Sequence, residues 1–403
     1  MKPEPTKLNL VLILTGGYGF PTGDAYTNRI LAFAKGFVKN GCRVSLLIIY
    51  PGRKNQVSKS GSMEGFDYYF CTSPIWPDGK LRKIATGIKG IFNSLIMLQK
   101  LNRESIIDAI ITFSQKFSQN FPVYLFTRLK GILFFRENNE YPRIVLSRGH
   151  DKLSSVERLY FSFVNRFFDG YIYISTSLVA FNKPFIGKNM PVMIVPIIVD
   201  DDRFIFDQFP PQKEITFCGN LYGEKDGVTL LIQSFALIHK DFPAYILKLI
   251  GHTSNPVEFE KLSQLVYELE VSEKVVFTGF VHRDHVPELL DQSALLVLAR
   301  PDNIQAKGGF PTKLGEYLAT GRPVLVTSVG DIPNYIHDGV NGFLARPGSV
   351  EDFAGKIRMI LQDYENAADV GKEGKKLSLT SFNNKFQAER ILGFIEMVKN
   401  NKN

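Results

Sequence analysis

Cysteine is scarce in this chain: its 403 residues include only Cys42, Cys71 and Cys218. These three lie far apart, so they cannot form a disulfide framework, and no CxxC or His/Cys spacing indicates a zinc site. We therefore expect free thiols in a reducing cytoplasm. Long apolar runs are also missing, since none reaches the ~18 residues that a membrane-spanning helix needs. The short apolar run near the N-terminus leads into glycines, which predicts a first β-strand and not a signal peptide.

Charge is distributed unevenly. Residues 1–200 carry 26 Lys/Arg and 13 Asp/Glu, whereas residues 201–403 carry 22 and 27, which gives +8 overall. A basic half joined to an acidic half indicates two domains with different partners. The basic half favours an anionic surface, such as phospholipid head groups or a lipid-linked phosphate, and no zinc-finger, RRM or KH signature supports nucleic acid as a partner.

Strand and helix patterns alternate along both halves. Apolar runs predict strands at residues 8–14, 43–50, 106–113, 131–136, 170–175 and 193–196, and again at 214–218, 245–250, 274–278, 294–298, 323–327 and 342–345. The segments between them have helical spacing, except residues 52–66, which are polar and rich in Gly and Ser and are predicted to form a loop. This alternation predicts an α/β fold with two doubly wound, Rossmann-like parallel sheets that face each other across a cleft.

Three segments follow from this pattern. Residues 1–199 form an N-terminal Rossmann-like domain, residues 200–379 form a second one, and residues 380–403 form a helix that returns to the first. The triplet Asp200-Asp201-Asp202 lies in the expected linker. We interpret it as linker and capping residues rather than a metal site, because aspartate favours such positions.

Residues 80–103 predict an amphipathic helix. Leu81, Ile84, Ile88, Ile91, Leu95 and Leu98 fall on one stripe, and Arg82, Lys89 and Lys100 fall on the other side. Such a helix either packs its apolar stripe on the sheet or lies on a membrane surface. The first interpretation is favoured, and the second would make the protein peripheral on the inner face of the plasma membrane.

The segment Gly308–Val324 carries the strongest indication of chemistry. Its glycines let a ligand approach the backbone closely, and a helix begins near Thr312, which is a candidate N-cap. Unpaired N–H groups and the positive end of the helix dipole suit a diphosphate there. Lys313 lies in the first turn, where a cation is unfavourable without an anion nearby. Glu316 follows one turn later and could accept two hydrogen bonds from a ribose diol.

This segment resembles the nucleotide-sugar signature of glycosyltransferase family 4, which has the GT-B fold. Its residues read Gly-Phe-Pro-Thr-Lys-Leu-Gly-Glu-Tyr-Leu-Ala from Gly309. The turn from Phe217 to Gly227 resembles the family's donor loop, and residues 276–280 resemble the strand end that meets the nucleobase. In the first half, residues 16–23 resemble the acceptor-side loop, and residues 135–142 resemble the family's strand-end Glu-x-Asn-Glu-x-Pro variant.

The resemblance implies a set of site residues. Donor contacts are expected at Gly16, Gly17, Gly219, Asn220, Lys225, Gly279, Phe280, Arg300, Gly309, Phe310, Pro311, Thr312, Lys313 and Glu316, and catalytic roles at Glu137, Glu140 and Lys225. Two positions depart from the family pattern. Gly308 stands where the family often has a first Glu that touches the sugar, and Asn220 stands where it often has an Arg.

The implied activity is retaining transfer of a sugar from a nucleoside diphosphate to a glycan or a lipid-linked acceptor, in cell-surface polysaccharide synthesis. Lys225, Lys313 and the helix start would stabilise the leaving diphosphate, with no metal or other cofactor. His282 and His285 are interpreted as lying near the base or at a helix start rather than as a metal pair. A sugar-nucleotide epimerase or hydrolase and a catalytically silent sugar-nucleotide-binding subunit remain alternatives. A dinucleotide-dependent oxidoreductase is not supported, because no GxGxxG motif follows a strand.

Overall fold

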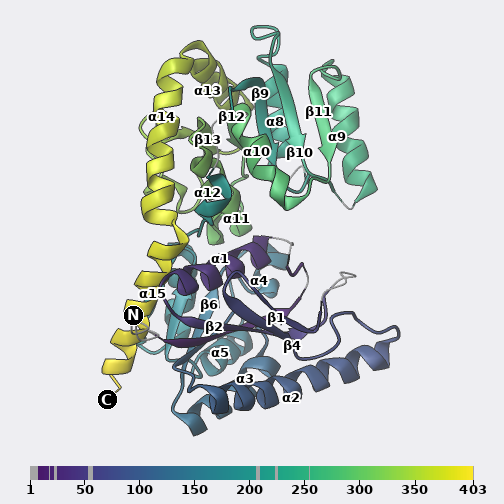
Figure 1. Cartoon of the computed structure of the whole chain (residues 1–403). Coiled ribbons are helices and arrows are strands. Elements are labelled where there is room, and N and C mark those ends of the chain that lie inside the picture. Colours follow the sequence, from purple (N-terminus) through teal and green to yellow (C-terminus); the bar gives the residue numbers. More distant parts are fainter. Residues whose placement is uncertain are drawn as a thin grey trace. The chain divides into compact units, whose positions relative to one another are not determined.

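Figure 1 shows a computed structural model of the chain, which describes residues 8–17, 19–21, 25–52, 58–205, 209–222, 226–253 and 255–402. The chain divides into two compact units. The first unit comprises Met1–Ile198 and Asn384–Asn403, and the second comprises Val199–Asn383. Each unit has one largely parallel sheet and several helices, as the alternation of patterns predicts. Among the described residues, no helix is long and apolar enough to cross a membrane.

The first unit contains an eight-stranded sheet in the order β3-β4-β2-β1-β5-β6-β7-β8. Its strands are β1 (Asn9–Gly16), β2 (Arg43–Tyr50), β3 (Ser60–Met63), β4 (Phe66–Phe70), β5 (Ala109–Thr112), β6 (Leu133–Asn138), β7 (Gly170–Tyr173) and β8 (Val192–Ile194). Every neighbouring pair is parallel except β3 and β4. Strand β1 runs as NLVLILTG and is almost completely buried, as expected of a central parallel strand.

Helices cover both faces of this sheet (Figure 1). They are α1 (Ala25–Lys39), α2 (Lys80–Glu104), α3 (Phe117–Lys130), α4 (Arg143–Arg148), α5 (Ser155–Val164), α6 (Thr176–Asn182) and α15 (Asn384–Asn400). Figure 1 shows α1 on one side of the sheet and α2, α3 and α5 on the other. The C-terminal helix α15 packs against α1, where a Cβ on Gly36 would lie 2.2 Å from the backbone oxygen of Asn384. Glycine at position 36 therefore permits this close contact.

The predicted loop over residues 52–66 is partly wrong. Residues 53–57 lie outside the described part of the chain, but Ser60–Met63 forms β3, which pairs antiparallel with β4. The sequence of β3 is SGSM, so it has no apolar alternation that would have indicated a strand. Its stability comes from its partner, because Gly61 lies directly under the ring of Tyr68.

Helix α2 forms as predicted, but its predicted apolar stripe does not pack on the sheet. Only Leu98 of the six stripe residues is buried, and Leu81, Ile84 and Ile88 are exposed. The buried side instead carries Gly90, Ser94, Leu98 and Leu101. Small residues bring the helix backbone close to the sheet, which turns the large side chains outward.

The second unit contains a six-stranded, entirely parallel sheet in the order β11-β10-β9-β12-β13-β14. Its strands are β9 (Gln212–Cys218), β10 (Ile246–Ile250), β11 (Val275–Gly279), β12 (Ser293–Leu298), β13 (Val324–Thr327) and β14 (Phe343–Ala345). Its helices are α8 (Val228–Ala236), α9 (Pro256–Glu268), α10 (Val286–Asp291), α11 (Ile304–Gly308), α12 (Thr312–Thr320), α13 (Val350–Gln362) and α14 (Tyr364–Leu377). The six strands agree with the predicted ones to within two residues.

Candidate functional site

The strand order of the second unit reverses between β9 and β12. The chain proceeds from β9 outward to β10 and β11, and then from β12 outward to β13 and β14. In an open parallel sheet, ligands bind outside the carboxyl ends of the strands at such a reversal. At these strand ends, Gly219 follows β9, Gly251 follows β10, Gly279 ends β11 and Arg300 lies two residues beyond β12. This edge is the candidate site.

The ammonium group of Lys313 lies directly over Gly219. A Cβ on Gly219 would lie 2.0 Å from Lys313 Nζ and 2.3 Å from its Cε, so no other residue fits at position 219 without moving the lysine. Lys313 Nζ is also 3.0 Å from Asp226 Oδ1 and 4.6 Å from the centroid of the Phe217 ring. The lysine is therefore held in place beside the end of β9.

The N-terminus of α12 is open. Pro311 is the N-cap residue and Thr312 is the first helical residue, so the prediction of Thr312 as the cap is wrong. Among the described residues, no side chain makes a capping hydrogen bond there. Because the first N–H groups of a helix have no partners within it, this end of α12 attracts an anion.

The loop before α12 is fixed by buried contacts. Phe310 is 4% exposed and packs on the rings of Tyr335 and Phe382, with centroids 5.4 and 6.0 Å away. Phe310 therefore anchors this loop in the core, which does not fit its expected role as a donor contact. On α12, the buried Tyr317 hydroxyl accepts a hydrogen bond from the Cys218 N–H at 2.7 Å, which ties the helix to the end of β9.

Gly309 and Arg300 lie side by side in this loop region. A Cβ on Gly309 would lie 3.3 Å from the Gln305 backbone oxygen and 3.9 Å from an Arg300 guanidinium nitrogen. The Arg300 backbone is held by Thr327, whose hydroxyl donates to the Arg300 carbonyl at 2.7 Å. The structure thus brings a second cation to the loop that leads to α12.

Glu316 is held by an arginine. Its Oε1 accepts from Arg203 at 2.7 Å, and Arg203 also donates to the backbone carbonyl of Arg283 at 2.8 Å. Burial lowers the pKa of Arg283, and the nearby charge of Arg203 lowers it further. Neither arginine could be predicted as a site residue, because Arg203 is 113 residues from Glu316 in the chain. Only the fold brings them together.

Desolvation raises the pKa of the Cys218 thiol to about 12, and the Glu316 carboxylate adds to this shift while Lys313 and Arg203 oppose it. Four groups at the end of β9 and on its neighbours thus interact electrostatically. The arrangement places a protonated thiol, not a thiolate, beside the charged groups of the site.

An exposed aromatic ring stands at the end of β11. Phe280 is 73% exposed, and its ring lies 5.7 Å from that of His252 in an edge-to-face arrangement. Gly279 precedes Phe280 with a φ of 72°, and its carbonyl accepts from the Gly251 N–H at 3.1 Å. His252 was not predicted as a site residue; its position just after a strand-ending glycine was the available signal. Asn220 is also exposed on this edge. Lys225, the other predicted lysine, lies outside the described residues.

In the first unit, the two predicted carboxylates differ in environment. Glu137 is 2% exposed and pairs with the buried Arg29 at 2.8 Å, and burial raises the pKa of Glu137 while Arg29 opposes the shift. Arg29 also donates to the carbonyls of Val195 and Pro196. Glu137 is therefore an interior residue, which does not fit direct contact with an acceptor. Glu140 is exposed.

Gly16 and Gly17 lie where β1 ends, at the strand reversal of the first sheet. A Cβ on Gly17 would lie 2.6 Å from the Phe70 ring, and the Gly17 N–H donates to the Tyr50 carbonyl at 3.1 Å. The close approach of the Phe70 ring thus explains why position 17 is a glycine. Both glycines remain predicted donor contacts.

Next to them, a cation stacks on an aromatic pair. Lys116 Nζ lies 4.6 Å from the centroid of the Tyr50 ring, which is 5.9 Å from the ring of Trp76. The backbone bridge between Gly52 and Ile75 holds the Trp76 loop beside β2. Desolvation lowers the pKa of Lys116, and the charge of Arg143 lowers it further. This group could not be predicted from the sequence, because its members come from three separate segments.

The described residues contain no group of three or more His, Cys, Asp or Glu side chains that could hold a metal ion. The rings of His282 and His285 are 6.4 Å apart, and His282 Nδ1 lies 3.4 Å from Asp284. Asp201 and Asp202 begin a 3₁₀ turn, where Asp201 accepts from the Asn383 side chain at 2.8 Å.

Residues 199–377 match the sequence model of the glycosyl transferases group 1 family. The second unit is a domain of this family. The match includes β9, α12 and the site between them, so the resemblance to glycosyltransferase family 4 is confirmed. The N-acetyl-α-D-glucosaminyl L-malate synthase of Bacillus anthracis is 31% identical over 168 residues, which are 42% of this chain and 40% of that protein. The chain thus matches about two fifths of that relative's length.

Solved structures support the fold of both units. The sucrose-phosphate synthase of Thermosynechococcus elongatus aligns over 98% of this chain and 100% of its own, with a TM-score of 0.73 and 14% identity. HepE of Anabaena, solved with UDP and glucose, aligns over 97% and 100%, with a TM-score of 0.69 and 15% identity. These neighbours are GT-B proteins, and the predicted GT-B fold is confirmed.

Proposed function

We propose that this protein is a retaining glycosyltransferase that moves a sugar from a nucleoside diphosphate to a glycan or lipid-linked acceptor in cell-surface polysaccharide synthesis. The observation that carries the proposal is the uncapped start of α12, with Lys313 Nζ over Gly219 at the strand reversal of the second unit. The family match supports glycosyl transfer, and HepE of Anabaena, solved with UDP and glucose, supports a nucleotide-sugar donor.

Each chemical group of the donor has a proposed partner at the carboxyl-end edge of the second sheet. The diphosphate binds the N–H groups at the start of α12 and the Lys313 ammonium, with Arg300 close to the same loop and Lys225 as a further cation. The base stacks on exposed Phe280 beside His252. Glu316 accepts hydrogen bonds from the ribose with a carboxylate that Arg203 orients.

The chemical step breaks the bond between the anomeric carbon and a diphosphate oxygen, and an acceptor oxygen takes its place on the same face of the sugar. The acceptor hydroxyl passes its proton to the departing diphosphate. Negative charge develops on the departing diphosphate. Lys313 and the start of α12 are already oriented toward it, so they stabilise this charge without reorganisation. We propose that the step needs no metal ion.

The acceptor binds the first unit. Trp76 offers an apolar ring face for a sugar, and Lys116 beside Tyr50 offers a cation for an anionic group of the acceptor. Glu140, which is exposed, positions the acceptor hydroxyl, whereas Glu137 holds Arg29 inside the unit. An anionic membrane, met through residues 80–103, is the proposed surface on which a lipid-linked acceptor is presented.

Incubation of the protein with a panel of nucleotide sugars, with and without membrane extract, tests this function. Transfer predicts release of the nucleoside diphosphate that depends on the acceptor, and an anomeric configuration in the product that matches the donor. Release that is unaffected by acceptor would instead show a hydrolase. Binding without turnover would show a catalytically silent subunit. This alternative is tested because Gly308 stands where the family often has a Glu that touches the sugar. A second run with a chelator should leave the rate unchanged.

A further inference from the structure

Large apolar side chains are exposed on the outer sides of three helices of the first unit. Residues that are at least 64% exposed are Leu81, Ile88 and Phe92 on α2, Leu129 on α3, and Val156 and Leu159 on α5. We refer to these six residues as the outer apolar face. Helix α2 packs against α3, and the Phe117 ring of α3 lies 5.7 Å from the Phe163 ring of α5. The three helices therefore form one layer on the same side of the sheet (Figure 1).

The orientation of α2 is the reverse of an ordinary surface helix. A Cβ on Gly90 would lie 2.5 Å from the Ile49 carbonyl oxygen, and the Asn93 side chain donates to the Cys71 carbonyl at 2.7 Å. The helix is thus attached through small and polar residues. A surface helix normally turns its apolar residues to the core. Exposed apolar patches of this kind mark sites of interaction with a protein or a membrane.

The charge of α2 indicates which of these two partners covers the outer apolar face. The helix contains six basic residues and a single acidic one, Glu104. Within the described part of the chain, no carboxylate lies within ion-pair distance of Lys80, Arg82, Lys83 or Lys89. Two copies of the chain that met through α2 would bring like charges together. Anionic lipid head groups, in contrast, neutralise the lysines while the acyl region accepts the apolar side chains.

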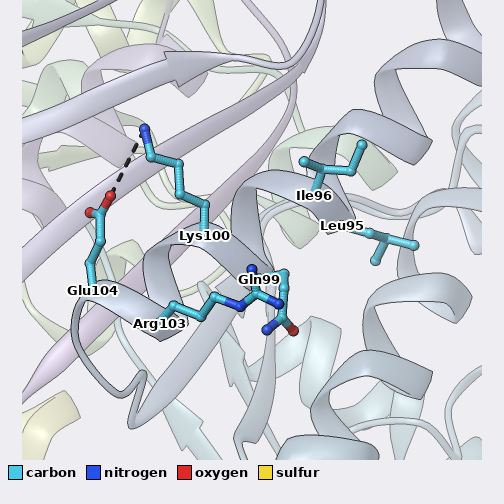
Figure 2. Close-up of a pocket in the computed structure, with 6 residues that line it drawn as sticks. All are labelled: Leu95, Ile96, Gln99, Lys100, Arg103 and Glu104. Carbon is cyan, nitrogen blue, oxygen red and sulfur yellow. Dashed lines mark ion pairs between the residues drawn. The ribbon is translucent and has the colours of Figure 1, made fainter.

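A shallow pocket lies along the C-terminal half of α2. Figure 2 shows its lining, in which Leu95 and Ile96 lie about one turn from Lys100 and two turns from Arg103. The pocket has a volume of about 500 Å³, and Lys100 Nζ is 3.9 Å from Glu104. An apolar wall next to two cations matches the two chemical parts of a phospholipid, its acyl carbons and its phosphate.

We propose that the outer apolar face and the basic residues of α2 form a docking surface for an anionic phospholipid bilayer. Helix α2 lies in the interface, with Leu81, Ile88 and Phe92 in the acyl region and the lysines at the head groups. This docking surface extends the membrane contact of the proposed function to α3 and α5. It rests on the proposed function only for the identity of the acceptor that the membrane presents.

Co-flotation of the full chain with vesicles tests the proposal. We expect the protein to float with phosphatidylcholine vesicles that contain 30% phosphatidylglycerol and to remain behind with pure phosphatidylcholine. Replacing Arg82 and Lys89, which lie seven residues apart on one side of α2, by Gln should weaken partitioning by about 25-fold, since each basic residue contributes about fivefold, and should reduce its dependence on salt. Ile88→Asp with Phe92→Asp should abolish flotation without a loss of thermal stability, because both side chains are exposed.

Val257→Asp with Tyr267→Asp on α9 is the matched control, since these side chains are also exposed but lie in the second unit. It should float like the unsubstituted protein. Flotation that is absent with anionic vesicles, or unchanged in the α2 variants, overturns the proposal. So does light scattering that shows a dimer which Ile88→Asp with Phe92→Asp dissociates, because a second copy would then cover the face. Donor turnover on a vesicle-free soluble acceptor tests the proposed function separately.

Discussion

Replacing Gly219 by Ala should weaken donor binding by displacing Lys313. The new Cβ would lie 2.0 Å from Lys313 Nζ, and the two other nearest atoms that it would meet also belong to Lys313. The ammonium group must retreat by roughly 1.5 Å to reach an ordinary contact distance near 3.5 Å. It then loses its hydrogen bond to the diphosphate, and a hydrogen bond to a charged group contributes ~1.5–3 kcal/mol.

This energy corresponds to a loss of roughly 10- to 150-fold in affinity. Isothermal titration with UDP, GDP and ADP identifies the ligand that binds best, and the variants are then compared with that ligand. Lys313→Ala should cause a similar loss. Because both changes remove the same contact, the double variant should bind no more weakly than Lys313→Ala.

Lys307→Ala on α11 is the matched control, because it removes an equal charge from an exposed lysine that pairs with Asp302. It should leave affinity within about twofold. Losses that multiply in the double variant would show that Gly219 and Lys313 act independently. Unchanged affinity in Lys313→Ala would remove the diphosphate from this site altogether.

Three further changes separate the other roles. Phe280→Ala should weaken nucleotide binding by ~1–3 kcal/mol, the usual contribution of stacking on a base, with no change in melting temperature; equal affinity in a titration would move the base elsewhere. Glu137→Ala should lower the free energy of unfolding by ~3–5 kcal/mol, because it leaves Arg29 buried without its carboxylate. Glu140→Ala should instead reduce the rate of transfer with little change in stability. Denaturant titrations and rate assays in which the two variants behave alike would contradict this. Because burial raises the pKa of the Cys71 thiol to about 12, only about one in 10⁴ is a thiolate at pH 8, so Cys71, which is 3% exposed, should resist iodoacetamide in the folded protein and react on unfolding; mass spectrometry showing rapid native labelling would contradict it.

Much of the fold could be predicted because most of its strands are recognisable from a few consecutive residues. A strand such as NLVLILTG is buried on both faces and therefore apolar throughout, which the sequence shows directly. Strand β3 could not be predicted, because SGSM owes its conformation to the partner strand β4. Helix α2 shows the opposite case: its periodicity gave the helix correctly, but the buried side was decided by the close approach of Gly90 to Ile49.

The site divides in the same way. Lys313 and Glu316 belong to one short segment with a recognisable spacing, so the sequence alone nominated them. It also nominated Phe310, whose ring the structure places in the core instead. The partners Arg203, Arg283 and His252 come from other segments, and no local pattern connects them to α12.

The amino-acid sequence by itself determined that this is an α/β protein of two doubly wound units, and it nominated a helix start near Thr312 as the proposed diphosphate site, because glycines, apolar runs and helix-start residues act over a few neighbouring positions. Tertiary structure decided which side chains meet: Lys313 over Gly219, Arg203 on Glu316, and Arg29 inside the first unit with Glu137. These contacts join residues that are about a hundred positions apart, and only packing of the sheets and helices sets such distances.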